Sequence, residues 1–210
     1  MKKPNGETAD TVQPEIKQVV LASQSKARAA LFASLGISVK VYPTNTDESV
    51  SLNLPPDEIV LMLSKRKADT AAEVFGDDKN LIIAADTVVY YDGLILGKPS
   101  GGEDAYNMLS MLSGNYHEVY TGLTVALAGK NVSVCDRTRV KFREIDQSDI
   151  EAYIATGEPL SKAGSYGAQG IGAAFIESVE GDYFNVVGLP VGKLAGVLRE
   201  EFGLSVFDLI

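Results

Sequence analysis

Residues 81–86 read Leu-Ile-Ile-Ala-Ala-Asp, an uninterrupted apolar run that ends in a carboxylate. A run without polar alternation is typical of a strand that is buried on both faces. We therefore expect a central strand over 81–85 with Asp86 at its carboxyl end. In open α/β sheets ligands bind at the carboxyl ends of strands, so Asp86 is a candidate for catalysis or metal binding. The alternative is that Asp86 only caps the following turn.

The chain that follows Asp86 predicts a hairpin and then alternating strands and helices. Asp92-Gly93 separates the apolar runs 88–91 and 94–96, which indicates a hairpin. Further strands are expected over 119–127, 132–142 and 173–179, and helices over 101–112, over 146–156 and from about Pro190. Between them, the glycine-rich stretch 157–172 predicts a loop folded over a ligand or another segment.

The chain that precedes residue 81 reads as strand, helix, strand, helix. The apolar run 18–22 leads through Ser23-Gln24-Ser25 into a helical stretch, 26–35, that Gly36 ends. Serine is a favoured N-cap and glycine a favoured residue just past a helix. A strand over 37–42 and a helix from Pro55-Pro56 to about Phe75 follow. This order predicts an α/β fold, a twisted mixed β-sheet flanked by helices.

Composition bounds the class of protein. The 210 residues are 45% hydrophobic and 22% charged, as in ordinary globular proteins. Residues 1–16 are polar and predict a loose tail, and 17–210 are expected to form a single domain, without internal repeats. Cys135, the one cysteine, cannot form an internal disulfide, which indicates a reducing compartment such as the cytoplasm.

Charge and hydropathy argue against two kinds of partner. With 19 Lys and Arg against 28 Asp and Glu, the net charge of −9 disfavours broad nucleic-acid binding, which needs a basic surface. No apolar run reaches the roughly 20 residues of a membrane-spanning helix. A small anionic substrate is compatible with this balance if a local group of cations binds it.

One such group of cations lies at Ser23-Gln24-Ser25-Lys26-Ala27-Arg28. Backbone N–H groups at a helix N-terminus, two hydroxyls and two cations can hold a phosphate there. Ordinary helix capping beside surface charges is the alternative.

More scattered polar residues complete the candidates. Lys67, Lys98 and Lys162 are cations that would have to be brought together by the fold, and each alone is typical of a solvated surface. The pair Asp47-Glu48 offers carboxylates to a metal such as Mg²⁺, which needs only one or two of them beside substrate phosphates. His117, the one histidine, is interpreted as structural.

Several segments, in one register from Leu21 to near the C-terminus, resemble the Maf (septum-formation-inhibitor) family. They are Leu21-Ala22-Ser23-Gln24-Ser25 with Arg28, Asp47-Glu48, Lys67-Ala68, Ala85-Asp86-Thr87-Val88-Val89, Gly97-Lys98-Pro99, His117-Glu118-Val119-Tyr120-Thr121-Gly122, Gly157-Glu158-Pro159-Leu160, 162–170 and Val187-Gly188-Leu189-Pro190. Each segment is a weak signal alone, and their shared order makes a chance match improbable.

The resemblance implies a fold similar to the inosine-triphosphate pyrophosphatases and a divalent-metal-dependent hydrolase (Mg²⁺, Mn²⁺ or Co²⁺). Such an enzyme cuts nucleoside triphosphates to the monophosphate and pyrophosphate. Asp86 is then the catalytic residue, as general base or as metal ligand, with Glu48 supporting the metal. The phosphate binders implied are Ser23, Arg28, Lys67 and Lys98. A homodimer is also implied.

The resemblance extends to base selectivity. Thr87 after the catalytic Asp, and Tyr166 to Gly170 with Gln169, match the branch that is selective for dTTP and UTP. Ala27 departs from the family, which usually has Arg there in Ser-Pro-Arg-Arg. Lys26 lacks the planar fork of arginine, so the loss of Arg at 27 shifts or broadens the expected substrate range.

Two other functions remain open on sequence alone. A nucleotide-binding regulator of cell division would keep the cations but would not need Asp86. An α/β protein that takes another phosphorylated metabolite would be consistent with Ala27.

Overall fold

The computed structural model describes residues 15–47, 49 and 54–210. Of the tail expected over 1–16, residues 1–14 lie outside this range, and so does Glu48. Within the described residues the strands are β1 (Gln18–Leu21), β2 (Val39–Val41), β3 (Asn80–Tyr91), β4 (Leu94–Leu96), β5 (Tyr116–Leu127), β6 (Lys130–Phe142) and β7 (Ile176–Glu180). The α-helices are α1 (Lys26–Ser34), α2 (Pro56–Phe75), α3 (Gly102–Leu112), α4 (Gln147–Ala155), α5 (Tyr183–Val187) and α6 (Val191–Phe202).

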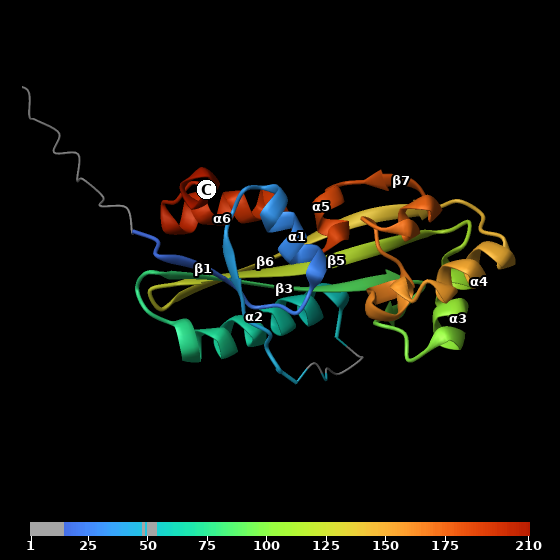
Figure 1. Ribbon diagram of the computed structural model, residues 1–210, viewed down its shortest axis with the longest axis horizontal. Helices are drawn as coiled ribbons and strands as arrows, with labels where there is room; N and C mark the ends of the chain where they lie inside the picture. Colours follow the sequence, from blue (N-terminus) through green and yellow to red (C-terminus); the bar gives the residue numbers. More distant parts are fainter. Residues whose placement is uncertain (1–14, 48, 50–53) are drawn as a thin grey trace, which may run out of the picture.

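The described strands form one mixed seven-stranded sheet, in the order β2-β1-β3-β5-β6-β7 with β4 beside β3. β1 pairs parallel with β2 and β3, whereas β3, β5, β6 and β7 pair antiparallel. Helices α1 and α6 cover one face at the β1 end, α2 covers the opposite face, and α3 and α4 lie at the far end of the long strands (Figure 1). The expected fold class, a mixed sheet flanked by helices, is confirmed.

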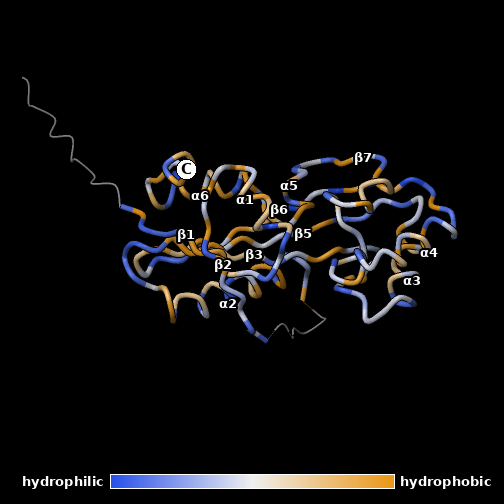
Figure 2. Tube along the Cα trace, in the orientation of Figure 1, coloured by the Kyte–Doolittle hydropathy of each residue, from blue (hydrophilic) through white to orange (hydrophobic). Residues whose placement is uncertain are grey.

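Apolar residues concentrate along the central strands, and the connecting segments are more hydrophilic (Figure 2). A first apolar cluster, with Phe32 and Leu194, fills the space between the sheet and α1 and α6. Two smaller clusters lie under α2. Another large cluster, with Phe142 and Tyr153, lies at the end that carries α3 and α4. The long strands β3, β5 and β6 connect the two ends.

Local signals in the sequence set several element boundaries. Ser25 caps α1, because its side chain accepts a hydrogen bond from the Arg28 amide, and Pro56 is the first residue of α2. Asp92 and Gly93 have φ of 47° and 84°, the left-handed values that a two-residue hairpin turn requires. These three predictions are confirmed.

Two sequence-based predictions are wrong in detail. β3 is one strand of 12 residues, so Asp86 lies in its middle and not at the end of a strand over 81–85. The strand expected over 173–179 begins at Ile176, because the preceding residues form a short 3-10 helix, Ile171–Phe175. No helix in the described part of the chain is both long and apolar enough to cross a membrane.

Candidate functional site

The site lies where one edge of β3 changes its neighbour. β1 pairs with β3 as far as Leu21 and Ile83, and β4 begins to pair at Val89 on the same edge. Among the described strands, none pairs with that edge between 84 and 88. We call this stretch the edge gap. It places Asp86 and Thr87 where a ligand can approach the sheet, as the carboxyl end of a strand would.

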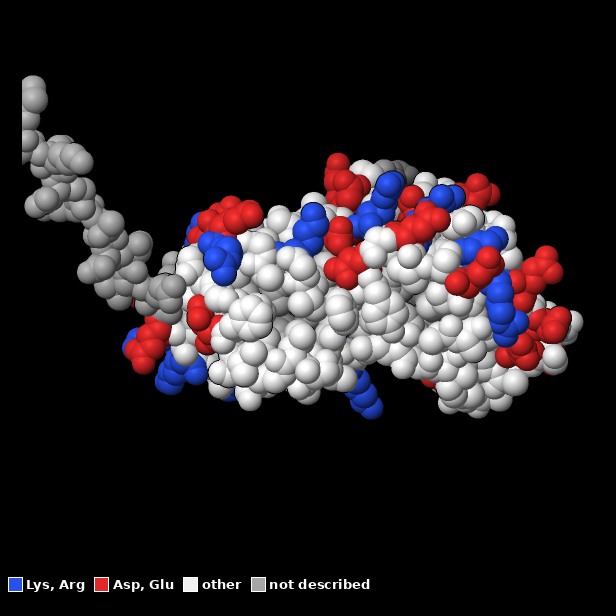
Figure 3. All heavy atoms as spheres, turned by 90° about the horizontal axis from the view of Figure 1, so that it is seen from above, with Lys and Arg blue, Asp and Glu red and all other residues white. Residues whose placement is uncertain are grey.

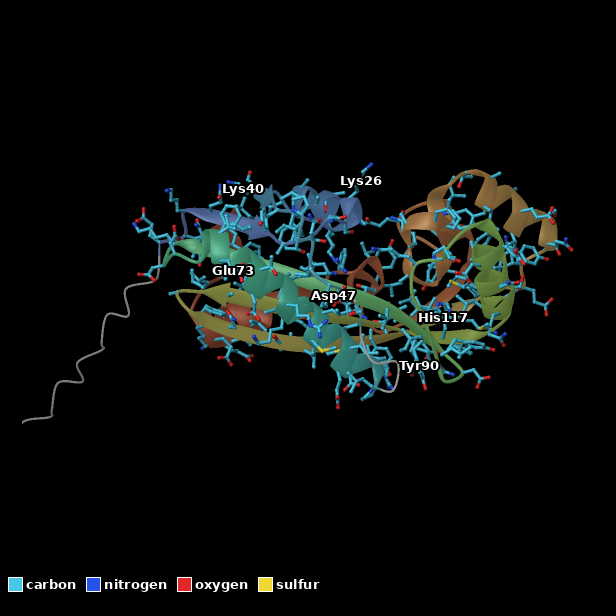
Figure 4. All side chains as sticks on the ribbon, turned by 90° about the horizontal axis from the view of Figure 1, so that it is seen from below. Lys26, Lys40, Asp47, Glu73, Tyr90 and His117 are labelled. Carbon is cyan, nitrogen blue, oxygen red and sulfur yellow. The ribbon has the colours of Figure 1, made fainter. Side chains whose placement is uncertain are left out.

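The chain beyond β1 borders the edge gap. After Ala22 donates its amide to the Ile83 carbonyl at 2.9 Å, the backbone turns away into α1. The Ser25 amide donates to Ser23 Oγ at 3.1 Å, which fixes the turn that leads to the helix N-terminus. Figure 4 shows Lys26 at that end of α1, with its side chain projecting outward, and Lys26 is exposed.

On the α2 face of β3, Asp86 forms a buried ion pair with Lys67. Lys67 Nζ lies 2.5 Å from Asp86 Oδ1, and only 7% and 8% of these two residues are exposed. Two charges this far from water are stable only when they are paired. The approach of α2 makes the pair possible. Gly122, which pairs with Asp86 in the sheet, has no side chain, and a Cβ there would lie 2.2 Å from the Val60 carbonyl oxygen in α2.

On the opposite face of β3, Arg28 is held by three hydrogen bonds. Its Nε donates to the Gly188 carbonyl at 2.6 Å, one Nη donates to Ser23 Oγ at 3.1 Å, and the other donates to Thr87 Oγ1 at 2.9 Å. Arg28 and Ser23 are buried. A guanidinium fixed in this way presents its charge in one orientation.

The structure therefore divides the predicted cations between two faces. Asp86 and Thr87 are neighbours in sequence, and successive side chains of a strand point to opposite faces. The Asp86–Lys67 pair therefore lies on one face of β3 and the Thr87–Arg28 pair lies on the other. Ser23 joins the second group. The two groups meet at the edge gap.

Lys98 and Gln169 come from two segments that are joined beside Val89, just past the edge gap. The Gly164 amide donates to the Gly97 carbonyl at 3.0 Å, which ties the glycine-rich stretch to the residue before Lys98. A Cβ at Gly164 would lie 2.7 Å from the Val89 side chain, so this stretch packs directly on β3. Lys98 and Gln169 are exposed, and Ala27 is partly exposed beside Arg28.

The glycine-rich stretch is organised by Glu158, a residue to which the sequence analysis gave no role. Its carboxylate accepts hydrogen bonds from the amides of Ile171 and Gly172 and from the Tyr153 hydroxyl, at 3.0, 3.3 and 2.9 Å. Burial raises the pKa of Glu158, but these hydrogen bonds outweigh it and the net pKa is lowered. A Cβ at Gly170 would lie 2.2 Å from this carboxylate, so a side chain there would displace the carboxylate from its hydrogen bonds. The expected loop is thus a series of short 3-10 turns around one carboxylate.

The buried end of this stretch is Tyr166, whose hydroxyl lies 2.8 Å from His117 Nε2. His117 is 2% exposed, and burial lowers its pKa to about 4. In Figure 4 His117 lies in the part of the sheet that carries α3 and α4. The interpretation of His117 as structural agrees with this position.

Carboxylates that could bind a metal are sparse in the described structure. No group of three or more His, Cys, Asp or Glu residues with metal-binding spacing occurs among the described residues. Asp47 accepts hydrogen bonds from the Ser49 hydroxyl and amide, at 2.7 and 2.8 Å, and these lower its pKa. Glu48, predicted to support a metal, lies outside the described residues, and Asp86 is the described carboxylate of the edge gap.

Charges on the outer surface are mixed. On the face seen in Figure 3, Lys and Arg side chains are interspersed with Asp and Glu. Arg28 and Lys67, which are buried, contact the edge-gap residues Thr87 and Asp86.

The sequence and structure were compared with known proteins. A family model described as "Maf-like protein" matches residues 18–201. A dTTP/UTP pyrophosphatase of Bacillus cereus is 41% identical over 191 residues, which cover 91% of this chain and 93% of that protein. A dTTP/UTP pyrophosphatase of Bacillus anthracis is 40% identical and is covered to 98%. Among solved structures, the Staphylococcus aureus Ham1 protein is similar with a TM-score of 0.38 and 14% identity, over 60% of this chain and 72% of that chain.

Proposed function

The chain belongs to the Maf family, and on that premise we propose that it hydrolyses nucleoside triphosphates to the monophosphate and pyrophosphate. We further propose that dTTP and UTP are its preferred substrates, because relatives about 40% identical along nearly their whole length carry that name. The observation that carries the proposal is the buried Lys67–Asp86 pair at the edge gap, beside an oriented arginine.

Each charged group has a proposed role. Asp86 acts on the attacking water, as its general base or by holding the metal that activates it. Lys67 and Arg28 neutralise phosphate oxygens from the two faces of β3, and Ser23 and Lys98 add hydrogen bonds. Hydrolysis of a phosphoanhydride depends mainly on positioning and charge neutralisation, so cations converging on one carboxylate are sufficient.

A divalent cation fits these residues. Mg²⁺ is bound by one or two carboxylates together with substrate phosphates, and Asp86 supplies one such carboxylate at the edge gap. We propose Asp86 and Glu48 as the protein ligands of Mg²⁺, Mn²⁺ or Co²⁺. When bound, the ion would polarise the phosphate oxygens and lower the pKa of a water molecule.

Base selectivity is proposed to come from the exposed side of the edge gap. Gln169 is exposed on the glycine-rich stretch, whose backbone is fixed by Glu158, so its amide is presented from a rigid support. An amide can pair with the donor and acceptor edge of a pyrimidine, and a base that leaves such groups unsatisfied is rejected. Ala27, beside Arg28, leaves room where a bulkier side chain would restrict the substrate.

The experiment is pyrophosphate release from a panel of triphosphates, with each metal added in turn, by the wild type and by Asp86→Asn. General acid–base catalysis contributes about 10²- to 10⁴-fold, so we expect kcat for dTTP to fall at least about 100-fold. Asp69→Asn is the matched control, because Asp69 is a partly exposed carboxylate of α2 that bonds Lys65 and the Asn131 side chain of β6, and not the residues of the edge gap. Its activity should not change.

The regulator hypothesis predicts a different result. A wild type that binds dTTP but releases no pyrophosphate with any metal, and whose binding survives Asp86→Asn, would overturn hydrolysis and favour a binding function. Calorimetric titration with dTTP separates the two cases.

A further inference from the structure

Arg28 is connected to the interior of the protein by a chain of hydroxyl groups. Its Nη contacts Thr87 Oγ1, which lies 2.9 Å from Thr121 Oγ1 in the neighbouring strand β5. Thr121 Oγ1 in turn donates to the carbonyl of Asn185 at 2.9 Å. Thr121 and Asn185 are completely buried.

Counting protons fixes the direction of this chain. A guanidinium only donates and a carbonyl only accepts, while each threonine hydroxyl has one proton. Thr121 donates its one hydroxyl proton to the Asn185 carbonyl. Thr87 must therefore donate its own proton to Thr121, and it accepts a hydrogen bond from Arg28. Both threonine protons are thus committed, which fixes the orientation of the two hydroxyls.

The far end of the chain is rigid. The Asn185 side-chain amide donates to the Val119 carbonyl and to Thr138 Oγ1, both at 3.0 Å, which holds α5 against the sheet. α5 ends at Val187, and the carbonyl of the next residue, Gly188, accepts from Arg28 Nε. The segment that holds Asn185 thus holds Arg28 twice, directly and through the two threonines.

We propose that Thr87 and Thr121 are positioning residues that orient Arg28 toward the phosphates. This inference rests on the proposed function of the edge gap. It assigns a role to Thr121, which is out of reach of the edge gap itself because it is fully buried. It also gives Thr87 a positioning role beside the base selectivity that the family resemblance implied.

The test is a double-mutant cycle of Thr121→Val with Arg28→Ala. Valine keeps the volume of threonine and removes its hydroxyl, so the neutral hydrogen bonds to Thr87 and Asn185 are lost, and we expect kcat/KM to fall about tenfold. In the Arg28→Ala background the same change should have an effect under about twofold, because the group it orients is gone. Thr121→Ser should recover most of the loss.

One further variant separates positioning from packing. Thr124→Val is the matched control, since Thr124 is another fully buried hydroxyl of β5, bonded to Ser64 and Ser133 on the opposite face. Its kcat/KM should stay at the wild-type value. An equal Thr121→Val effect with and without Arg28 would overturn the proposal.

Binding keeps this test apart from that of the proposed function. The same cycle can be measured as the Kd of dTTP by calorimetry, which needs no turnover. If Thr121→Val weakens dTTP binding in the wild type but not in the Arg28→Ala background, the positioning role is supported, even if the wild type proves not to hydrolyse dTTP. A wild type that binds no triphosphate overturns the positioning role together with the function. If Thr121→Val does not fold, Thr87→Val enters the cycle in its place.

Discussion

Asp86 and Lys67 illustrate at the scale of single residues why a charged side chain can occupy the middle of a buried strand. The apolar run predicts a strand that stops before Asp86, and an isolated carboxylate is expensive to bury. The strand continues because α2 supplies an ammonium group 2.5 Å away, from a residue 19 positions earlier. No local pattern records that partner.

The charges of Asp86 and Lys67 should depend on each other for the stability of the fold as well as for function. Removing one partner of a buried ion pair leaves an uncompensated charge, which typically costs about 3–5 kcal/mol. We expect Lys67→Met to lower the free energy of unfolding in urea by about 3 kcal/mol, and the double variant with Asp86→Asn to lose much less than the two single losses added together. Strictly additive losses would show that the two charges do not depend on each other.

The positioning of Arg28 could be predicted only in part. Arg28 and Ser23 were recognised from the turn at the start of α1, where neighbours in sequence are neighbours in space. Thr121 stood in a quoted segment but received no role, because its contact with Thr87 depends on the register of β3 against β5. Asn185 carried no signal at all, since an asparagine in a short helix usually faces water.

At the scale of elements, the distance between α2 and the sheet determines whether Lys67 reaches Asp86. Gly122 sets this distance, because the α2 backbone at Val60 occupies the space where its side chain would be. A glycine inside a strand usually marks such a close approach of another backbone. The sequence placed Gly122 in a strand but could not tell which helix would pack on it.

Gly122→Ala should therefore damage both the fold and the site. The new Cβ would lie 2.2 Å from a backbone oxygen that cannot rotate away, so α2 must move, and overpacking of this kind costs about 3 kcal/mol or more. We expect a lower Tm, and a kcat/KM below that of the wild type in the molecules that remain folded. Differential scanning calorimetry and pyrophosphate release measure the two effects.

Gly196→Ala is the matched control for this substitution. Gly196 lies within α6, where a Cβ would meet no atom within 4 Å, and alanine is favoured over glycine in helices by about 1 kcal/mol. Its Tm should stay equal or rise. A Gly122→Ala protein as stable and active as Gly196→Ala would show that α2 does not need this close approach.

At the scale of the whole molecule, β3, β5 and β6 pass from the apolar cluster under α1 and α6 to the cluster under α3 and α4. Because the same strands line both clusters, we expect neither end to unfold without the other. A titration in one cluster should then change the stability of the entire chain. His117, between Phe142 and Tyr166, is the group that makes this measurable.

Stability should fall as the pH drops from 7 to 5. Burial lowers the pKa of His117 to about 4, whereas an unfolded histidine titrates near 6.5, so between these values only the unfolded chain binds the proton. Stability from this group is complete above pH 6.5 and is lost progressively toward pH 4, which amounts to about 2 kcal/mol between pH 7 and 5. His117 is the one histidine of the chain, so no other side chain of ordinary pKa titrates within this range.

Urea unfolding at the two pH values should show this loss in the wild type and a much smaller one in His117→Asn, followed both by far-ultraviolet circular dichroism and by tyrosine fluorescence. If the free energy of unfolding fell equally with pH in the two proteins, the buried imidazole would not be the titrating group. Unfolding midpoints that differ between the two probes would mean that the two ends unfold separately.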